Sequence, residues 1–558
     1  MTRSRGATSS RSDGGGPSPD HGGDGAVSEV RAVLERGGGP LCEVGRVTAT
    51  DRGQGLLVVA GDLGVAQWRG FDASDLAGSG VSSHPVAVYD AEGRDCRSVM
   101  FSRLCVNAVR VHPSLPLAAV ATGYVVDGDA DGELILLDLR TGAWRSVLDE
   151  WRMVVDVAWR SGEELEALLV PLDAEDADGE LEQVVMRRKD WSAVAADEIE
   201  VEELPVTLRR GGRPGAGREA PSGGRRLVWA VRALADGGVL ACSEGVGLER
   251  WSAEGERLWA VGVDGVGCQL SAAGDGRGAL VVVDCWEEVR WGDEDVPSEL
   301  LRVDLAGGRV VARMSEGVPW VASFRRDGTY ALRDVVPEWT IGEVALTHDL
   351  WVGGPAASPV RLGKVADYDV QGDYLGVADC PEILLLTYRE DGRRPARRWV
   401  TQVDVDRGDL VPLFPLDWDG ESRGVVLGGP GLFHEDSAGR GLIQAGGPAT
   451  RWEGPPGAGF VARRRFPDGR LEWVQWVQAT VTGVASHGDA VVAVENSGGF
   501  VVLDVLTGER LAEGVLRSPQ GHPVIPLCCD VTGSGDVVVG CLDGRLLTFE
   551  GLLPGRLA

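Results

Sequence analysis

The sequence lacks the apolar segments that would place it in or across a membrane. No stretch approaches the roughly eighteen apolar residues that a spanning helix needs. Residues 1–6 carry basic side chains, but no apolar core follows them, so the N-terminus does not have the layout of a secretory signal. We therefore expect a cytoplasmic protein with no membrane partner.

Motifs of the common catalytic and cofactor sites are also missing. None of the seven histidines forms an HExxH or HxH pair. Neither a GxSxG nucleophile elbow, a GxxxxGK[ST] loop nor a GxGxxG strand–helix junction is present. The sequence therefore predicts no catalytic residues and no cofactor-binding residues.

The ten cysteines do not form a CxxC pair, so the sequence does not support a zinc ribbon. Several lie in or beside apolar runs, as Cys528 and Cys529 do after residues 524–527. Small thiols in such runs are typical of buried core positions. We expect free, buried thiols in a reducing cytosol.

Positive charge is scarce. The 558-residue chain has 55 basic and 85 acidic residues, a formal net charge of −30. A strongly negative surface repels phosphate backbones, so nucleic acid is not an expected partner. The excess acid favours basic protein surfaces or cations, or serves solubility alone. High Ala, Gly, Arg and Val with few Lys is typical of high-GC bacterial genomes.

What the sequence has in abundance is glycine, with 81 residues, and short apolar runs. Residues 56–60, 117–121, 279–283 and 490–494 are apolar runs bounded by Gly or Asp. None shows a helical period, so each predicts a buried strand. The 18 tryptophans are expected to pack between strands rather than to sandwich a cofactor.

A Gly-terminated step recurs along the chain. It appears as VYDAEG, LDLRTG, RWSAEG, VDLAGG, VDVDRG and LDVLTG, ending at Gly93, Gly142, Gly255, Gly308, Gly408 and Gly508. The intervals are 49, 113, 53, 100 and 100 residues, which are one or two copies of a unit of about fifty. A second repeat, DADGEL, begins at Asp129 and returns at Asp176.

Residues 107–142 resemble a WD40-type repeat, with an His-Pro turn at His112 and the LDLRTG step. Residues 250–262 are more similar to the quinoprotein-type repeat, with ERLW after the turn. The Trp-Asp dipeptide of strict WD40 repeats is absent from the steps. The resemblance implies an all-β fold, a single β-propeller of four-stranded antiparallel blades.

The strong steps favour seven or eight blades, whereas the weak phases raise the count to ten and allow a larger ring or two rings. We expect a disordered N-terminal tail over residues 1–39, apart from a short helix near residues 27–36, because Gly, Ser, Asp and Pro dominate there. The propeller should cover residues 40–556. Residues 45–60 should supply the strand that completes the last sheet.

Acidic loops form the first candidate site. DGDADGEL at residues 127–134 matches much of a calcium loop, with Asp127, Asp129 and Asp131 as oxygen ligands. The alternative is an acidic hairpin loop between strands. Equivalent loops of a propeller share one face, which predicts an acidic rim that contacts a basic partner or only solvent. Its residues are Asp127, Asp129, Asp131, Glu175, Asp176, Asp178, Asp293 and Asp295.

A basic, Gly- and Pro-rich stretch at residues 208–226 contrasts with the acidic chain. It is expected to be a flexible insertion in a blade, or alternatively a docking segment for an acidic partner.

These features predict a non-enzymatic scaffold for protein–protein interactions, since the fold itself hosts many activities. The alternative is a propeller enzyme of the lactonase or quinoprotein-dehydrogenase type that uses the central channel. In size and repeat divergence, the chain also resembles the propeller component of bacterial systems with a MoxR-type AAA+ ATPase and a von Willebrand A-domain protein. That resemblance implies such a pair as partners.

Overall fold

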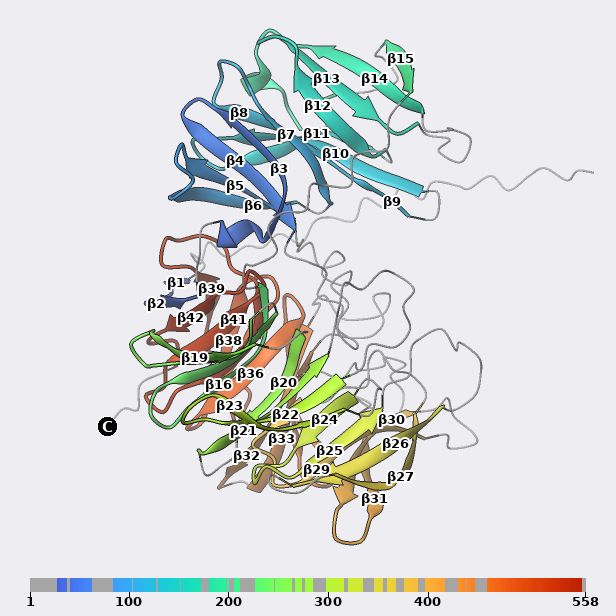
Figure 1. Cartoon of the computed structure of the whole chain (residues 1–558), viewed down its shortest axis with the longest axis vertical. Coiled ribbons are helices and arrows are strands. Elements are labelled where there is room, and N and C mark those ends of the chain that lie inside the picture. Colours follow the sequence, from blue (N-terminus) through green and yellow to red (C-terminus); the bar gives the residue numbers. More distant parts are fainter. Residues whose placement is uncertain are drawn as a thin grey trace, which may run out of the picture.

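The computed structural model is built almost wholly from strands (Figure 1). The residues that it describes are 28–37, 41–62, 84–102, 104–126, 129–150, 152–171, 180–196, 198–199, 205–210, 226–244, 246–262, 266–272, 276–284, 298–315, 320–334, 346–354, 359–367, 376–389, 397–416, 430–437, 439–446 and 459–553. Within these ranges, helix is limited to two three-residue 3-10 turns, η1 (Cys42–Val44) and η3 (Trp191–Ala193). No helix in the described part of the chain is long and apolar enough to cross a membrane.

Three sheets come first along the chain and form the upper group in Figure 1. Their strands are β3 (Arg46–Gly53), β4 (Leu56–Asp62), β5 (His84–Asp90) and β6 (Cys96–Ser102); β7 (Val106–Val111), β8 (Leu117–Thr122), β9 (Tyr124–Val126), β10 (Asp129–Asp138) and β11 (Trp144–Glu150); β12 (Val154–Trp159), β13 (Glu164–Leu169), β14 (Glu180–Arg187) and β15 (Val206–Arg210).

Seven further sheets make up the lower group. Their strands, in chain order, are β16 (Arg226–Ala233), β17 (Val239–Glu244), β18 (Gly247–Trp251) and β19 (Arg257–Val261); β20 (Val266–Ala272), β21 (Gly278–Asp284), β22 (Ser298–Asp304) and β23 (Arg309–Met314); β24 (Trp320–Phe324), β25 (Tyr330–Asp334), β26 (Leu346–Gly353) and β27 (Val360–Asp367); β28 (Gly376–Ala378); β29 (Ile383–Arg389), β30 (Arg397–Asp404) and β31 (Asp409–Pro415); β32 (Pro430–Asp436), β33 (Gly439–Gly446), β34 (Gly459–Arg465) and β35 (Leu471–Val477); β36 (Val481–His487), β37 (Ala490–Glu495), β38 (Gly499–Asp504) and β39 (Arg510–Arg517); β40 (Pro526–Val531), β41 (Val537–Cys541) and β42 (Leu546–Phe549).

Hydrophobic clusters connect each of these seven sheets to the next. On β21, Val281 and Val283 pack on the sheet of β16–β19, whereas Leu280 and Val282 pack on the sheet of β24–β27. Alternate side chains of a strand point to opposite faces, so a sheet between two neighbours buries both. This is why residues 279–283 form an uninterrupted apolar run rather than an alternating one.

The succession of clusters returns to its start. The sheets of β36–β39 and β40–β42 share one cluster, and Val538 and Leu546 of the latter pack with Val228 and Val231 of β16. Because the last sheet along the chain contacts the first of this group, the seven sheets follow one another in a cycle. The predicted all-β fold of four-stranded antiparallel sheets in a propeller-like arrangement is confirmed.

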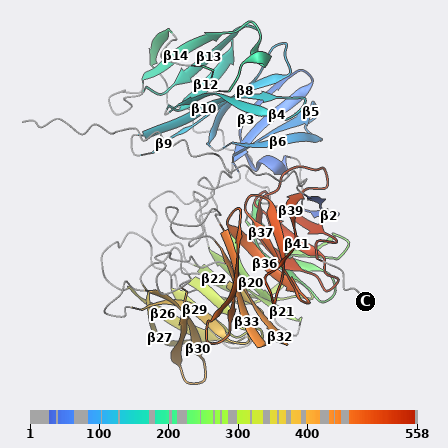
Figure 2. The same ribbon diagram turned by 180° about the vertical axis from the view of Figure 1, so that it is seen from behind.

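The upper three sheets have their own shared clusters and lie beside this cycle in both views (Figures 1 and 2). Phe101 of β6 reaches the lower group, where it packs with Leu227, Ile525 and Leu527. His522 Nε2 also lies 2.9 Å from the carbonyl oxygen of Cys96. The described residues form ten sheets, of which three stand outside the cycle, whereas the strong steps favour seven or eight blades; the number of blades stays a prediction.

The recurring step is the tight turn between the third and fourth strands of a sheet. Asp138 ends β10 and Asp504 ends β38, and their carbonyls accept hydrogen bonds from Gly142 N at 2.9 Å and Gly508 N at 2.8 Å. The Asp504 carboxylate also accepts from Thr507 N at 2.8 Å. Gly142 and Gly508 have φ of 74° and 72°, where glycine is favoured. At these two turns the Asp accepts the hydrogen bonds and the Gly supplies the positive φ, whereas the turn at Gly255 forms with Ser252 in place of the Asp.

Tryptophans dock on the same turns from the neighbouring sheet. Trp259 on β19 donates its indole N–H to the Leu305 carbonyl at 3.1 Å, and Trp473 on β35 donates to the Val505 carbonyl at 3.0 Å. Each acceptor directly follows a step aspartate. The prediction that tryptophans pack between sheets is confirmed at these two positions.

The N-terminal segment corrects two expectations. Residues 29–36 are neither tail nor helix: β1 (Glu29–Arg31) pairs in parallel with β39, and β2 (Leu34–Arg36) pairs antiparallel with β42. The strand that completes the last sheet is thus β2 rather than residues 45–60, which lie in β3 and β4. Because these strands pair with partners about five hundred residues away, local composition does not reveal them.

Candidate functional site

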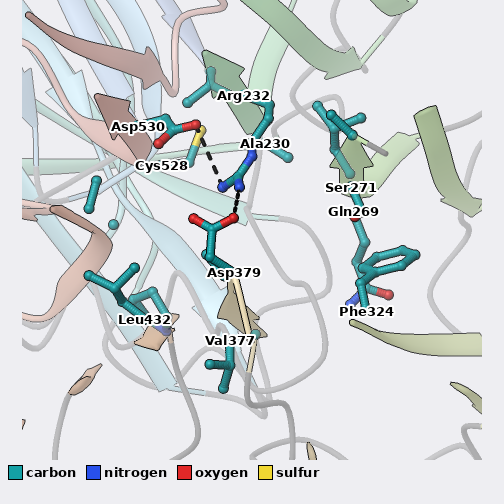
Figure 3. Close-up of a pocket in the computed structure, with 18 of the residues that line it drawn as sticks. Ala230, Arg232, Gln269, Ser271, Phe324, Val377, Asp379, Leu432, Cys528 and Asp530 are labelled. Carbon is teal, nitrogen blue, oxygen red and sulfur yellow. Dashed lines mark hydrogen bonds and ion pairs between the residues drawn. The ribbon is translucent and has the colours of Figure 1, made fainter. Parts of the chain in front are cut away.

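A cavity of about 430 Å³ is lined by residues from six of the seven sheets of the cycle, and we call it the central cavity (Figure 3). Its walls come from β16, β20, β24, β28, β32, β36 and β40 and the residues that follow them. The sheet of β29–β31 has only three strands and contributes none of them to the wall. β28, which precedes it in the chain, pairs in parallel with β32 instead of with β29, and residues of β28 line the cavity in its place. The volume is within the range of small-ligand pockets.

Side chains connect neighbouring inner strands around the central cavity. Gln269 on β20 donates to the Ala322 carbonyl of β24 at 2.8 Å and accepts from Ala322 N at 2.7 Å. Thr482 on β36 donates to the Pro526 carbonyl of β40 at 2.9 Å. These side chains form their hydrogen bonds with backbone groups of the neighbouring inner strand, so their role is to hold adjacent strands of the wall together.

Asp530 on β40 performs the same structural task beside a cation. Its carboxylate accepts from Ala233 N of β16 at 2.9 Å and from Val531 N at 2.8 Å. Arg232 Nη1 lies 3.7 Å from Asp530 Oδ2. Burial raises the pKa of Asp530, although Arg232 and the backbone donors partly oppose that rise.

Arg232 makes its second ion pair with Asp379, whose Oδ1 contacts Nη2 (Figure 3). Asp379 follows β28, which lies on a different wall from β16, so this pair reaches across the central cavity. Burial lowers the pKa of Arg232, but Asp530 and Asp379 outweigh that effect and raise it. Arg232 therefore stays charged and bridges two carboxylates.

Asp379 is held less firmly than Asp530. Its side chain is 47% exposed against 17% for Asp530. Its backbone φ is 57°, a left-handed conformation that costs a non-glycine residue energy. The strain and the exposure both lie at the residue that faces Arg232.

The rest of the wall is mainly apolar. Figure 3 shows Phe324, Val377 and Leu432 around the charged group. Arg325 is neutralised by Asp327, with Nε to Oδ1 at 2.9 Å, whereas Arg326 is exposed at the lining. The central cavity thus combines one fixed cation with an apolar surface, the usual composition of a pocket that orients a ligand.

Most of the predicted acidic rim lies outside the described residues: Asp127, Glu175, Asp176, Asp178, Asp293 and Asp295. Asp129 begins β10, with its backbone opposite Val126, and Asp131 is a half-buried residue of the same strand. Throughout the described ranges, no three His, Cys, Asp or Glu side chains gather in a group that could hold a metal ion. The rim and the calcium loop stay predictions.

The structure describes the basic stretch and the cysteines only in part. Residues 211–225 of the basic stretch lie outside the described part of the chain, while its flanks form the end of β15 and the start of β16. The eight cysteines whose side chains the structure describes are free, and Cys242, Cys380 and Cys541 are buried. The expectation of free, buried thiols is confirmed for these three.

Sequence reasoning missed Arg232, Asp379 and Asp530. One signal for Asp530 existed, because Asp51 on β3 occupies the same kind of position and accepts from Val111 N of the next sheet at 2.7 Å. Recognising the inner strand of each repeat would have revealed this recurring aspartate. Asp379 has no such signal, since it depends on the unusual pairing of β28.

Comparison with known proteins adds no family. No protein-family model matches the sequence, and a search of curated proteins returns no significant match.

Proposed function

We propose that this protein is a non-enzymatic interaction scaffold whose binding site is the central cavity. The observation that carries the proposal is the convergence of six of the seven sheets on one pocket with a charged Arg232 and an apolar wall. A rigid scaffold that positions few polar groups among apolar ones favours recognition.

The charged groups support binding rather than chemistry. Arg232 is shared by the carboxylates of Asp379 and Asp530, and Gln269 and Thr482 are bonded to backbone. A nucleophile needs a general base within hydrogen-bond reach, and these side chains do not form such a pair.

The proposed partner is another protein in the cytoplasm, and the AAA+ ATPase and von Willebrand A-domain pair is the specific candidate. Free cysteines are consistent with a reducing compartment. The central cavity is large enough for one chain end or one side chain of a partner protein to enter it.

The test is affinity capture from the native host with wild type and two tryptophan variants. Ser271→Trp fills the central cavity, whereas Leu258→Trp adds the same side chain at an outer strand, where Leu258 is 52% exposed. We expect wild type and Leu258→Trp to retain a partner that Ser271→Trp loses, with circular dichroism showing all three folded.

Equal capture by both variants would move the binding site elsewhere. Mass spectrometry of the purified protein checks the competing enzyme hypothesis: a stoichiometric metal or quinone would contradict a purely non-enzymatic role.

A further inference from the structure

We infer that the central cavity binds a carboxylate attached to an apolar body, and that the carboxylate of Asp379 stands where the ligand's carboxylate binds. This inference rests on the proposed function and names the chemical group that the site selects. Its basis is the different anchoring of the two acids that contact Arg232.

Arg232 is positioned for anion recognition by Asp530. Two backbone N–H groups fix Asp530, and its carboxylate, 3.7 Å from Nη1, attracts the guanidinium from the β40 side, whereas the guanidinium donates its hydrogen bond to Asp379 from Nη2. A guanidinium is planar and offers N–H donors on more than one edge. The edge that faces Asp379 can therefore donate hydrogen bonds to a ligand carboxylate in a fixed geometry. The arginine is thus organised before a ligand arrives.

Asp379 is the replaceable partner. It follows a strand of only three residues, has a left-handed backbone and keeps nearly half of its side chain exposed. Its charge also raises the pKa of Asp530, because two carboxylates share one arginine. A ligand carboxylate that takes its place lets residue 379 turn to water and relax.

Exchange of one carboxylate for another changes little free energy by itself, so the apolar wall must provide the affinity. Leu270, Phe324, Val377 and Leu432 line the central cavity beside the arginine. The affinity gained from the apolar body grows with the apolar area that it removes from water. Arg326, exposed at the lining, favours the approach of an anion despite the net charge of −30.

The probe is 3-phenylpropanoate, compared with its neutral amide and with 3-phenylpropylamine by isothermal titration calorimetry. The acid should bind, and the amide and amine should not. Asp379→Asn should tighten acid binding severalfold because it removes the internal competitor. Arg232→Lys, which keeps the charge beside Asp530, should weaken binding about tenfold through loss of the planar donor edge.

Asp349→Asn is the matched control, since Asp349 on β26 pairs with Arg361 away from the central cavity and should leave binding unchanged. Peptides ending in Phe, with a free or amidated C-terminus, distinguish a protein chain end from a free acid as the source of the carboxylate. Thermal unfolding verifies that each variant is folded.

Three results would overturn the inference: no heat from any acid or free-carboxylate peptide, acid binding unchanged by both variants, or amine binding that Asp379→Asn weakens. If a captured protein partner binds wild type and Arg232→Lys equally, the carboxylate inference fails while the scaffold proposal stands. If the acid binds as expected but no protein is captured, the scaffold proposal fails while the carboxylate inference stands.

Discussion

At the scale of single residues, the repeated motif is explained by two demands on one glycine. The step glycine must adopt a positive φ, and at Gly308 and Gly508 it must also leave room for a tryptophan of the adjacent sheet. A Cβ at Gly508 would lie 2.7 Å from the Trp473 ring, and one at Gly308 would lie 2.6 Å from Trp259. The glycine of the motif is therefore required by contacts between sheets as well as by the turn.

Gly508→Ala should lower the free energy of unfolding by about 2–4 kcal/mol, the sum of backbone strain and overpacking against Trp473. Gly551→Ala isolates the first effect, because Gly551 has φ of 70° but no atom near its Cβ position. It should cost about 1–2 kcal/mol. Equal losses in urea-induced unfolding would show that the tryptophan contact contributes nothing.

Buried thiols predict alkaline instability. Burial raises the pKa of Cys380 from 9.0 to about 12. Between these values the unfolded chain releases a proton that the folded chain keeps, so this stabilising contribution is complete below pH 9 and is lost as the pH rises towards 12. Unfolding free energies measured from pH 7 to 11 should fall less steeply in Cys380→Ala than in wild type. If the unfolding free energies of the two proteins differ by the same amount at every pH, ionisation of the Cys380 thiol does not affect folding.

At the scale of strands, apolar runs between Gly and Asp predict β4, β8, β21 and β37 correctly, because strands buried on both faces contain few polar residues. β1, β2 and β28 could not be predicted in this way. Each has three residues, too few for a period, and each is formed by a distant partner strand. Asp379 therefore escaped detection together with the strand that positions it.

Val33→Pro tests whether the N-terminal segment closes the last sheet. Val33 N donates to the Thr548 carbonyl at 2.8 Å, while the side chain is 54% exposed. Proline removes the donor with little loss of packing and should destabilise the protein by about 1–3 kcal/mol. Val33→Ala keeps the N–H and should change the melting temperature very little. If the two variants melt together, this hydrogen bond makes no contribution to closure.

At the scale of the whole molecule, the repeat predicts four-stranded sheets but not their grouping, since its strong steps favour seven or eight blades and the described residues form ten sheets. Both the cycle of seven and the group of three bury their sheets face to face, so their strands have the same composition. Which sheet meets which depends on contacts such as Val228 with Val538, which no local pattern specifies. The convergence that creates the central cavity is for the same reason invisible in the sequence.

The most direct test is an experimental structure of the protein with its captured partner. The account predicts that a partner group enters the central cavity, lies against Phe324 and Leu432, and replaces Asp379 beside Arg232. A partner seated only on outer strands, with the pair between Arg232 and Asp379 intact, would contradict it.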